Sequence, residues 1–233
     1  MIAALKDALA VHGMALRGGF IPVASDGVPS LGDGAPTKAV VLVGNIGGAM
    51  WPAFAASDAR SRHAANPLDQ WTRDVVDPIA ASFGAAVVYP FAGPPYFPFQ
   101  RWAARAEPLA VSPLKIFIHP VYGLWHAFRA ALLFREELAF AAPSDEASPC
   151  TTCQSQPCLH TCPVDAFGPT GLDDGRCAAH VAGPDGIECR ERGCLARRAC
   201  PVGQSFAYGP AQMKFHMEAF LAPRRQNPTV AKP

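Results

Sequence analysis

The sequence predicts an α+β protein in two parts, with expected boundaries at residues 1–142 and 143–233. Two observations support this prediction. All eight cysteines lie between Cys150 and Cys200, whereas the chain before them alternates expected strands and helices, which is the pattern of an α+β domain. With 233 residues, half of them apolar, the chain is long enough for one core and a small second module.

The first part is expected to begin with a helix and a buried strand. Residues Met1–Phe20 place apolar side chains near helical spacing among charged ones, which indicates an amphipathic helix and not a secretory signal. Residues Ala39–Val43 form an apolar run typical of a buried strand. The glycine-rich segment that starts at Gly44 is expected to end it as a turn, because its glycines lack the register of a dinucleotide-binding loop.

A second helix is expected to begin at Pro67, with Asn66 as its N-cap. Its apolar stripe comprises Val75, Val76, Ile79, Ala80 and Phe83, and Gly84 is expected to end it. The strands expected after this helix are Ala85–Tyr89, Lys115–Ile118 and Trp125–Phe134. The last two flank an expected turn at residues 120–123, which completes the sheet of the first part.

The second part contains a cysteine pattern that occurs twice. The first copy reads Cys150-Thr-Thr-Cys153-Gln-Ser-Gln-Pro-Cys158-Leu-His-Thr-Cys162-Pro, and the second reads Cys189-Arg-Glu-Arg-Gly-Cys194-Leu-Ala-Arg-Arg-Ala-Cys200-Pro. Both share Cys-x4-Cys-Leu followed by Cys-Pro-Val. In ferredoxin-type runs three closely spaced thiolates bind one 4Fe–4S cluster, and the cysteine before proline crosses to the other cluster. The repeat therefore predicts electron transfer.

Applied to this chain, the crossover rule divides the eight cysteines into two sets of four. The second copy lacks a counterpart of Cys150, and Cys177 is the cysteine that remains to fill that place. The first cluster is then expected to bind Cys150, Cys153, Cys158 and Cys200, and the second Cys162, Cys177, Cys189 and Cys194.

Other uses of eight cysteines fit the sequence less well. Two structural zinc sites would use eight thiolates, but zinc ribbons have separated cysteine pairs and not four cysteines ending in Cys-Pro. Disulfides belong to secreted proteins, and this sequence shows no secretory signal, so a reducing cytoplasm is expected. The net charge of +1 gives no electrostatic argument for nucleic acid, and charged residues interrupt the apolar stretch Pro108–Phe134, so no membrane span is expected.

The segment after Lys115 contains the run His119-Pro-Val-Tyr-Gly-Leu-Trp-His-Ala-Phe-Arg129, and Asn66-Pro-Leu-Asp-Gln70 lies upstream. These residues resemble the His-Pro-x-x-Gly-x-Trp-x-Ala-x-Arg and Asp-Pro-x-Asp-Gln segments of the CblC (MMACHC) family of cobalamin-processing proteins. The resemblance implies a flavin-nitroreductase-like fold that binds cobalamin base-off. Leu124 and Ala130 stand where the family has glycine.

The resemblance extends to the order of the two parts. Epoxyqueuosine reductases and reductive dehalogenases have a similar cobalamin domain followed by a two-cluster ferredoxin-like module, with the same order of cysteines. The resemblance also implies that the residues in contact with cobalamin are His119, Tyr122, Gly123, Trp125 and Arg129. A buried cation in an apolar strand also needs a partner, so Arg129 is expected either to pair with a carboxylate or to face the corrin.

Three functions remain open at this stage. The first is reductive removal of the upper cobalamin ligand, with electrons from a flavodoxin, a ferredoxin or a flavin reductase. The second is a cobalamin-dependent reductase of an organic substrate, and the third is an electron carrier without catalysis. The arginines around the second cysteine run either offset the negative charge of the clusters or form the docking patch for an acidic donor: Arg190, Arg192, Arg197 and Arg198. The chain is expected to be a monomer or a homodimer.

Overall fold

The computed structural model describes residues 1–62, 65–169 and 171–226 and divides the chain into two compact units. The first, the sheet unit, comprises Met1–Pro108 and His126–Glu146. The second, the cysteine unit, comprises Leu109–Trp125 and Ala147–Pro233. The units are therefore not two consecutive stretches of chain, because residues 109–125 leave the sheet unit and pack with the cysteines. The mixture of helices and sheet confirms the α+β class.

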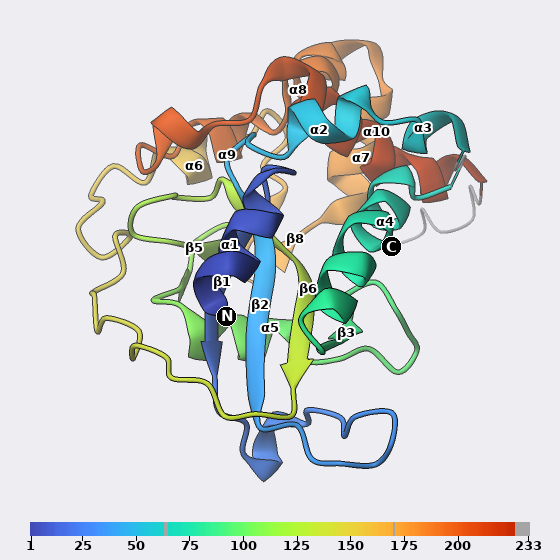
Figure 1. The fold of residues 1–233 in the computed structure, drawn as a ribbon. Coiled ribbons are helices and arrows are strands. Elements are labelled where there is room, and N and C mark those ends of the chain that lie inside the picture. Colours follow the sequence, from blue (N-terminus) through green and yellow to red (C-terminus); the bar gives the residue numbers. More distant parts are fainter. Residues whose placement is uncertain (63–64, 170, 227–233) are drawn as a thin grey trace. The chain divides into compact units, whose positions relative to one another are not determined.

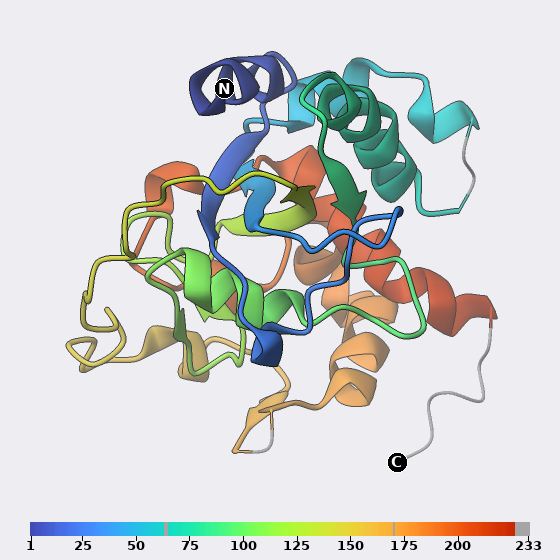
Figure 2. The same ribbon diagram turned by 60° about the horizontal axis from the view of Figure 1, so that its bottom comes forward.

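The sheet unit is built on an antiparallel sheet whose strands follow the order β1-β2-β6-β3. Helices α1 and α4 lie on one face of the sheet and α5 lies on the other (Figures 1 and 2). The strands are β1 Ala15–Phe20, β2 Ala39–Ile46, β3 Ala86–Val88 and β6 His126–Phe134, and the helices are α1 Ile2–Ala10, α2 Trp51–Ala56, α3 Ala59–Arg62, α4 Pro67–Ser82 and α5 Phe99–Ala106, with a 3-10 turn at Ala24–Asp26.

The expected helix over Met1–Phe20 is wrong beyond residue 10. Leu5 and Leu9 are fully buried as an amphipathic helix requires, but Val11 is exposed and the helix α1 ends before it. Gly13 then takes a left-handed φ of 68° and lies against the backbone of residues 49 and 50, a position that a residue with a Cβ cannot occupy. The chain turns there and continues as the edge strand β1.

Strand β2 was expected to end at Gly44, and it instead runs on to Ile46. The ladder with β6 continues through Gly44, Asn45 and Ile46, with a register shift at Gly44. A Cβ on Gly44 would stand 2.0 Å from the carbonyl oxygen of Ala127. The glycine therefore marks a close approach of two strands at a bulge and not the end of the strand.

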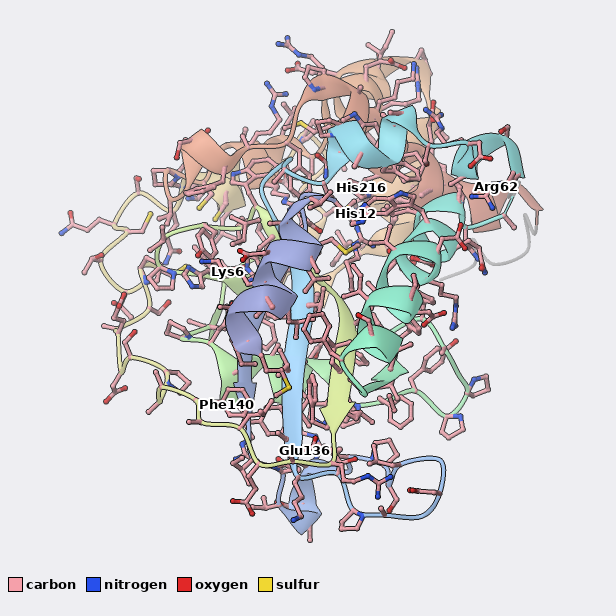
Figure 3. All side chains as sticks on the ribbon, in the orientation of Figure 1. Lys6, His12, Arg62, Glu136, Phe140 and His216 are labelled. Atoms are coloured by element: carbon pink, nitrogen blue, oxygen red, sulfur yellow. The ribbon has the colours of Figure 1, made fainter. Side chains whose placement is uncertain are left out.

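Helix α4 and strand β3 lie where the sequence places them. The helix begins at Pro67 and buries Val75, Val76 and Ala80 against the sheet. Asn66 occupies the predicted N-cap position, in a left-handed conformation. Its side chain makes no hydrogen bond to the start of the helix, so the expected capping by the side chain is wrong. The ring of Phe140, which is labelled in Figure 3, packs against the backbone of Gly19 in strand β1.

The cysteine unit consists of short elements around a long C-terminal helix. Helix α10 packs against α7 and α8. The expected strand Lys115–Ile118 is shorter than predicted, because Lys115 has a φ of 61° and closes a turn to Ser112. The elements are β4 Ala110–Val111, β5 Phe117–Ile118, α6 Pro157–His160, β7 Phe167–Gly168, β8 Gly171–Leu172, α7 Asp174–Ala182, α8 Ile187–Arg192, α9 Leu195–Arg198 and α10 Pro210–Gln226, with 3-10 turns at Pro184–Gly186 and Gln204–Phe206. In the described part of the chain, none of the helices has the length and apolar character needed to cross a bilayer.

Candidate functional site

The first cysteine set, Cys150, Cys153, Cys158 and Cys200, gathers in one place within the cysteine unit. Burial raises the pKa of the Cys158 thiol, and the neighbouring charges of Cys200, Cys150 and Cys153 raise it further. The pKa of Cys200 is likewise raised, first by burial and then by Cys150 and Cys153. Mutual repulsion of this kind operates only over short distances, so the four thiols that the repeat assigns together are close neighbours.

The surroundings of the first cysteine set are apolar. Cys158 and Cys200 belong to a buried cluster with Leu114, Ile118 and Leu124. A cavity beside them is lined by the four cysteines, Gln156 and a shell of apolar side chains: Pro113, Ile118, Pro149, Pro157, Pro201 and Val202. Three of these prolines lie directly beside a cysteine in the sequence, at Cys150, Cys158 and Cys200. The prolines contribute no backbone N–H donors to the wall of the cavity.

The second cysteine set is Cys162, Cys177, Cys189 and Cys194. Burial raises the pKa of Cys189, with additional contributions from Cys194 and Cys162. Burial also raises the pKa of Cys194, and Cys162 again contributes. Cys177 packs against the same buried cluster as Cys189, beside Val181 and Leu221. The structure thus brings three of the four thiols into electrostatic contact and places the fourth beside them.

Backbone N–H groups point at sulfur in both sets. Ala166 donates to Sγ of Cys162 over 3.3 Å. The first turn of α9 donates to the second set, where hydrogen bonds from its N–H groups lower the pKa of Cys189 and Cys194 against the effect of burial. Val202 acts in the same way on Cys200. Such donors stabilise negative charge on sulfur, whether it is a free thiolate or a metal-bound one.

The geometry of these thiols differs from that of a site for a single ion. Among residues 1–62, 65–169 and 171–226, no three histidine, cysteine or acidic side chains converge where they could hold one metal ion. The mutual effects of the thiols on their pKa values nevertheless place the four cysteines of the first set close together, and likewise Cys162, Cys189 and Cys194 of the second.

His119 lies in a closed turn of the cysteine unit. Its backbone exchanges two hydrogen bonds of 2.9 Å with Gly123, and its Nδ1 accepts the N–H groups of Val121 and Tyr122 at 3.0 and 3.3 Å. The ring is 8% exposed and stacks on Tyr122 with 4.1 Å between ring centroids. Because Nδ1 accepts, the neutral ring carries its proton on Nε2. The Nδ1 atom of His119 is therefore engaged by the backbone of its own turn.

The same turn rests on the chain that follows Cys200. Gly123 has a φ of 58°, and a Cβ on it would stand 2.0 Å from the carbonyl oxygen of Val202. Gly203 has a φ of 70° and faces Tyr122 equally closely. The two glycines allow the turn and the Cys-Pro-Val-Gly segment to touch backbone to backbone. The left-handed φ and this contact both require glycine at position 123.

Trp125, Arg197 and Tyr208 form a stack that the sequence did not reveal. The Arg197 guanidinium lies 4.6 Å from the Trp125 ring and 4.7 Å from the Tyr208 ring. Its Nε and Nη2 donate to the carbonyl oxygen of Leu124 at 3.2 and 2.5 Å. Arg197 consequently holds the end of the segment 109–125 against the second cysteine run.

Two other arginines of that run, Arg190 and Arg198, also make local contacts. Arg190 donates to the carbonyl oxygens of Val181 and Gly183 at the end of α7, and Arg198 pairs with Glu188 at 3.1 Å. These contacts favour a structural role for Arg190, Arg197 and Arg198 over a docking patch. Arg192 is exposed.

Arg129 lies on strand β6 of the sheet unit. Its Nη1 lies 3.9 Å from Oδ1 of Asp69, in the upstream motif segment. Burial raises the pKa of Asp69, and the charges of Arg129 and Arg73 act against that shift. The expected carboxylate partner of Arg129 is therefore Asp69. The five predicted contact residues divide between the units, with His119, Tyr122, Gly123 and Trp125 in the cysteine unit.

Arg17 is a buried charged residue that the sequence reasoning overlooked. It is fully buried in β1, and its Nε and Nη2 bind the two carboxylate oxygens of Glu107 at 2.6 and 2.5 Å. Its Nη1 donates to the carbonyl oxygen of Asn45, and Nη2 lies 3.2 Å from Nδ1 of His126. Glu107 and His126 flank the segment 109–125. The available signal was a lone arginine in a strand that faces the core.

The fold of this chain also occurs in other solved structures, at low sequence identity. A C. elegans B12-trafficking protein CblC, a homologue of human MMACHC, is similar over 94% of this chain and 95% of its own, with 12% identity and a TM-score of 0.53. An epoxyqueuosine reductase is similar over 91% of this chain and 68% of its own, with 13% identity and a TM-score of 0.51. The epoxyqueuosine reductase from Bacillus subtilis is similar over 88% and 66%, with 14% identity and a TM-score of 0.50.

These similarities show a shared fold, and they confirm the fold relationship expected from the two motif segments. No family model matches the sequence, and no curated protein matches it either.

Proposed function

We propose that this chain is an iron–sulfur, cobalamin-binding reductase that removes the upper axial ligand of cobalamin with electrons relayed through two 4Fe–4S clusters. The observation that carries the proposal is a juxtaposition within the cysteine unit. The His119–Gly123 turn is seated on Val202 and Gly203, directly after the cysteine Cys200 of the first set. The segment that resembles cobalamin proteins thus touches the segment that resembles ferredoxins.

The chemistry of the donor set fits two cubanes. Each set offers thiols only, in an apolar setting with backbone N–H groups directed at sulfur. The clusters, when bound, supply one-electron carriers between an external donor and the cobalt. Burial raises the pKa of Cys158, Cys189, Cys194 and Cys200, which favours the protonated thiol in these residues, so iron loading has to displace their protons. A reducing compartment and a donor such as a flavodoxin, a ferredoxin or a flavin reductase follow from this proposal.

The residues proposed to bind cobalamin have different capacities. Nδ1 of His119 already accepts the N–H groups of Val121 and Tyr122, so this nitrogen does not suit coordination of cobalt. Tyr122 and Trp125 offer aromatic surface. Arg129 keeps its charge near Asp69, which leaves it able to contact a polar group without becoming an unpaired buried cation.

Anaerobic reconstitution followed by a cyanocobalamin titration tests the proposal. We expect about eight irons per chain, a change of the visible spectrum to the base-off form, and release of cyanide when a reductant is added. The protein without iron serves as the control, and it is expected to bind cobalamin but to release no cyanide with the same reductant. Stoichiometric zinc, or an unchanged spectrum at protein excess, would refute the proposal.

A second function keeps cobalamin as a bound cofactor and reduces an organic substrate. The similarity to two epoxyqueuosine reductase structures and the shared order of cysteines favour it. It differs in one observable: cobalamin would remain bound through many turnovers. Equilibrium dialysis after reduction separates the two, because a processed substrate leaves the protein and a cofactor is retained. A carrier without catalysis would bind no cobalamin at all.

A further inference from the structure

An open hollow in the surface of the cysteine unit adjoins the first cysteine set. Its volume is about 540 Å³. Some of the residues that line it also line the cavity of the first cysteine set, and these are Pro149, Cys153, Pro201 and Val202. The hollow and the cavity therefore share a wall, and a molecule bound in the hollow lies close to whatever the four thiols bind.

The rest of the lining is polar and uncharged. It consists of Thr152, Gln154 and Ser155, all of which are exposed. Hydroxyl and amide groups both donate and accept hydrogen bonds, while the two prolines and Val202 supply apolar surface. Ligand sites combine an apolar lining with a few polar groups and enclose about 300–1,000 Å³. The hollow has this character, and it suits a ligand that is neutral, partly apolar and able to form hydrogen bonds.

The shared wall is also the seat of the His119–Gly123 turn. A Cβ on Gly123 would stand 2.0 Å from the carbonyl oxygen of Val202, and the Tyr122 ring contacts Phe206 with 5.1 Å between centroids. Val202 thus belongs to the cavity of the first cysteine set, to the hollow and to the contact with this turn. Within the cysteine unit, the hollow is therefore continuous with the segment that resembles cobalamin proteins.

The charge around the hollow does not favour an acidic electron-transfer protein as its occupant. The lining contains no cationic side chain. Residues 147–175, which include the first cysteine run, contain no lysine or arginine, and their acidic residues are Asp165, Asp173 and Asp174. Opposite charge guides redox proteins to their partners, so an acidic donor finds no attraction here. A neutral redox-active molecule fits the hollow better.

We propose that the hollow binds one edge of the corrin ring of cobalamin. Its three polar side chains form hydrogen bonds with the peripheral carboxamides, and its prolines and Val202 pack against the apolar surface of the ring. This inference rests on the proposed function, because that function brings cobalamin to the protein. It adds the loop between Cys150 and Cys158 to the predicted contact residues. Because Cys153 is part of the shared wall, the bound corrin lies beside the first cysteine set.

Filling the hollow tests this inference. Gln154→Trp in the reconstituted protein is expected to weaken the binding of cyanocobalamin at least about 10-fold, because the indole occupies the space and the hydrogen bonds of the amide are lost. Ser155→Trp is expected to act in the same way. Gln100→Trp makes the first change at an exposed position of α5 and is expected to leave the affinity unchanged. The affinities come from titrations followed by visible absorbance.

The iron content shows whether a tryptophan has disturbed the loop, because neither Gln154 nor Ser155 is a predicted ligand. Both variants are expected to keep about eight irons per chain. Gln154→Ala and Ser155→Ala add no bulk to the loop. Each is expected to weaken cyanocobalamin binding about 2- to 10-fold, which is the effect of losing one hydrogen bond, and they decide the question if a tryptophan variant loses iron.

Iron release provides a measurement at the hollow itself. Cyanocobalamin bound there covers the wall that contains Cys153, so it is expected to slow the loss of iron from the wild type to a chelator. In Gln154→Trp, the same protection is expected to need at least about 10-fold more cyanocobalamin. Iron release that saturating cyanocobalamin leaves unchanged would contradict the inference.

The outcomes separate this inference from the proposed function. If the wild type binds no cobalamin, the proposed function fails and this inference fails with it. If the wild type binds and the variants at 154 and 155 bind equally well, only this inference fails. Unchanged affinity together with slower reduction of Gln154→Trp by a reduced flavodoxin would make the hollow the docking surface of a donor protein, and that result also overturns the inference.

Discussion

Replacing Gly123 with alanine tests how tightly the His119–Gly123 turn is seated on the chain after Cys200. The left-handed conformation of Gly123 costs an alanine roughly 1–2 kcal/mol. The new Cβ would also stand 2.0 Å from the carbonyl oxygen of Val202 and 2.7 Å from its carbonyl carbon, so the backbone has to move. Overpacking of this kind costs about 1–3 kcal/mol. The variant is expected to lose roughly 2–5 kcal/mol of unfolding free energy in total.

Gly84 provides the matched control for this substitution. It has a φ of 67°, close to that of Gly123, but a Cβ there would meet nothing within 4 Å. Gly84→Ala therefore carries the conformational cost alone, and urea unfolding of both variants isolates the contact with Val202. Because Val202 lines the cavity of the first cysteine set, Gly123→Ala is also expected to release iron to a chelator faster than Gly84→Ala. Equal losses in the two variants would refute the close contact.

Three further outcomes are expected. Arg17→Met leaves the Glu107 carboxylate buried without its cation and should lower the free energy of unfolding in urea by about 3–5 kcal/mol. Adding Glu107→Gln to this variant should restore part of that free energy. A loss below about 1 kcal/mol for Arg17→Met would contradict the buried ion pair. Cys158→Ser and Cys189→Ser should each leave about four irons per chain, and loss of all iron in either variant would contradict two separate sets. Because the pKa of Cys158 is raised, less thiolate is present at pH 7 than in an exposed cysteine, so the rate of cluster assembly, followed by visible absorbance, should rise steadily from pH 7 to 9; a rate independent of pH would count against it.

Features encoded in short stretches of sequence were predictable. The spacing of the cysteine repeat assigned thiols to two sets, and the structure brings Cys150, Cys153, Cys158 and Cys200 together. The turn before Gly123 and the need of Arg129 for a partner, either a carboxylate or the corrin, were also predictable, because each depends on local geometry or on a general cost of burying charge. The identity of the partner, Asp69, came from the structure.

Features that depend on distant contacts were not predictable. Arg17 meets Glu107 at a sequence separation of 90 residues and His126 at 109, and no local pattern specifies such a pair. The extension of β2 through Gly44 depends on how closely β6 approaches it. The same residue type that signals a turn in isolation permits a close strand contact in the folded chain.

The segment 109–125 belongs to the cysteine unit although the residues on both sides of it in the sequence belong to the sheet unit. The residues that flank it, Glu107 and His126, are both held by the single guanidinium of Arg17 in the sheet unit. Its own residues pack with the cysteines, where Gly123 meets Val202 and the carbonyl group of Leu124 accepts hydrogen bonds from Arg197. Within the cysteine unit, the turn that contains His119, Tyr122 and Gly123 is therefore positioned by the same contacts that order the chain after Cys200.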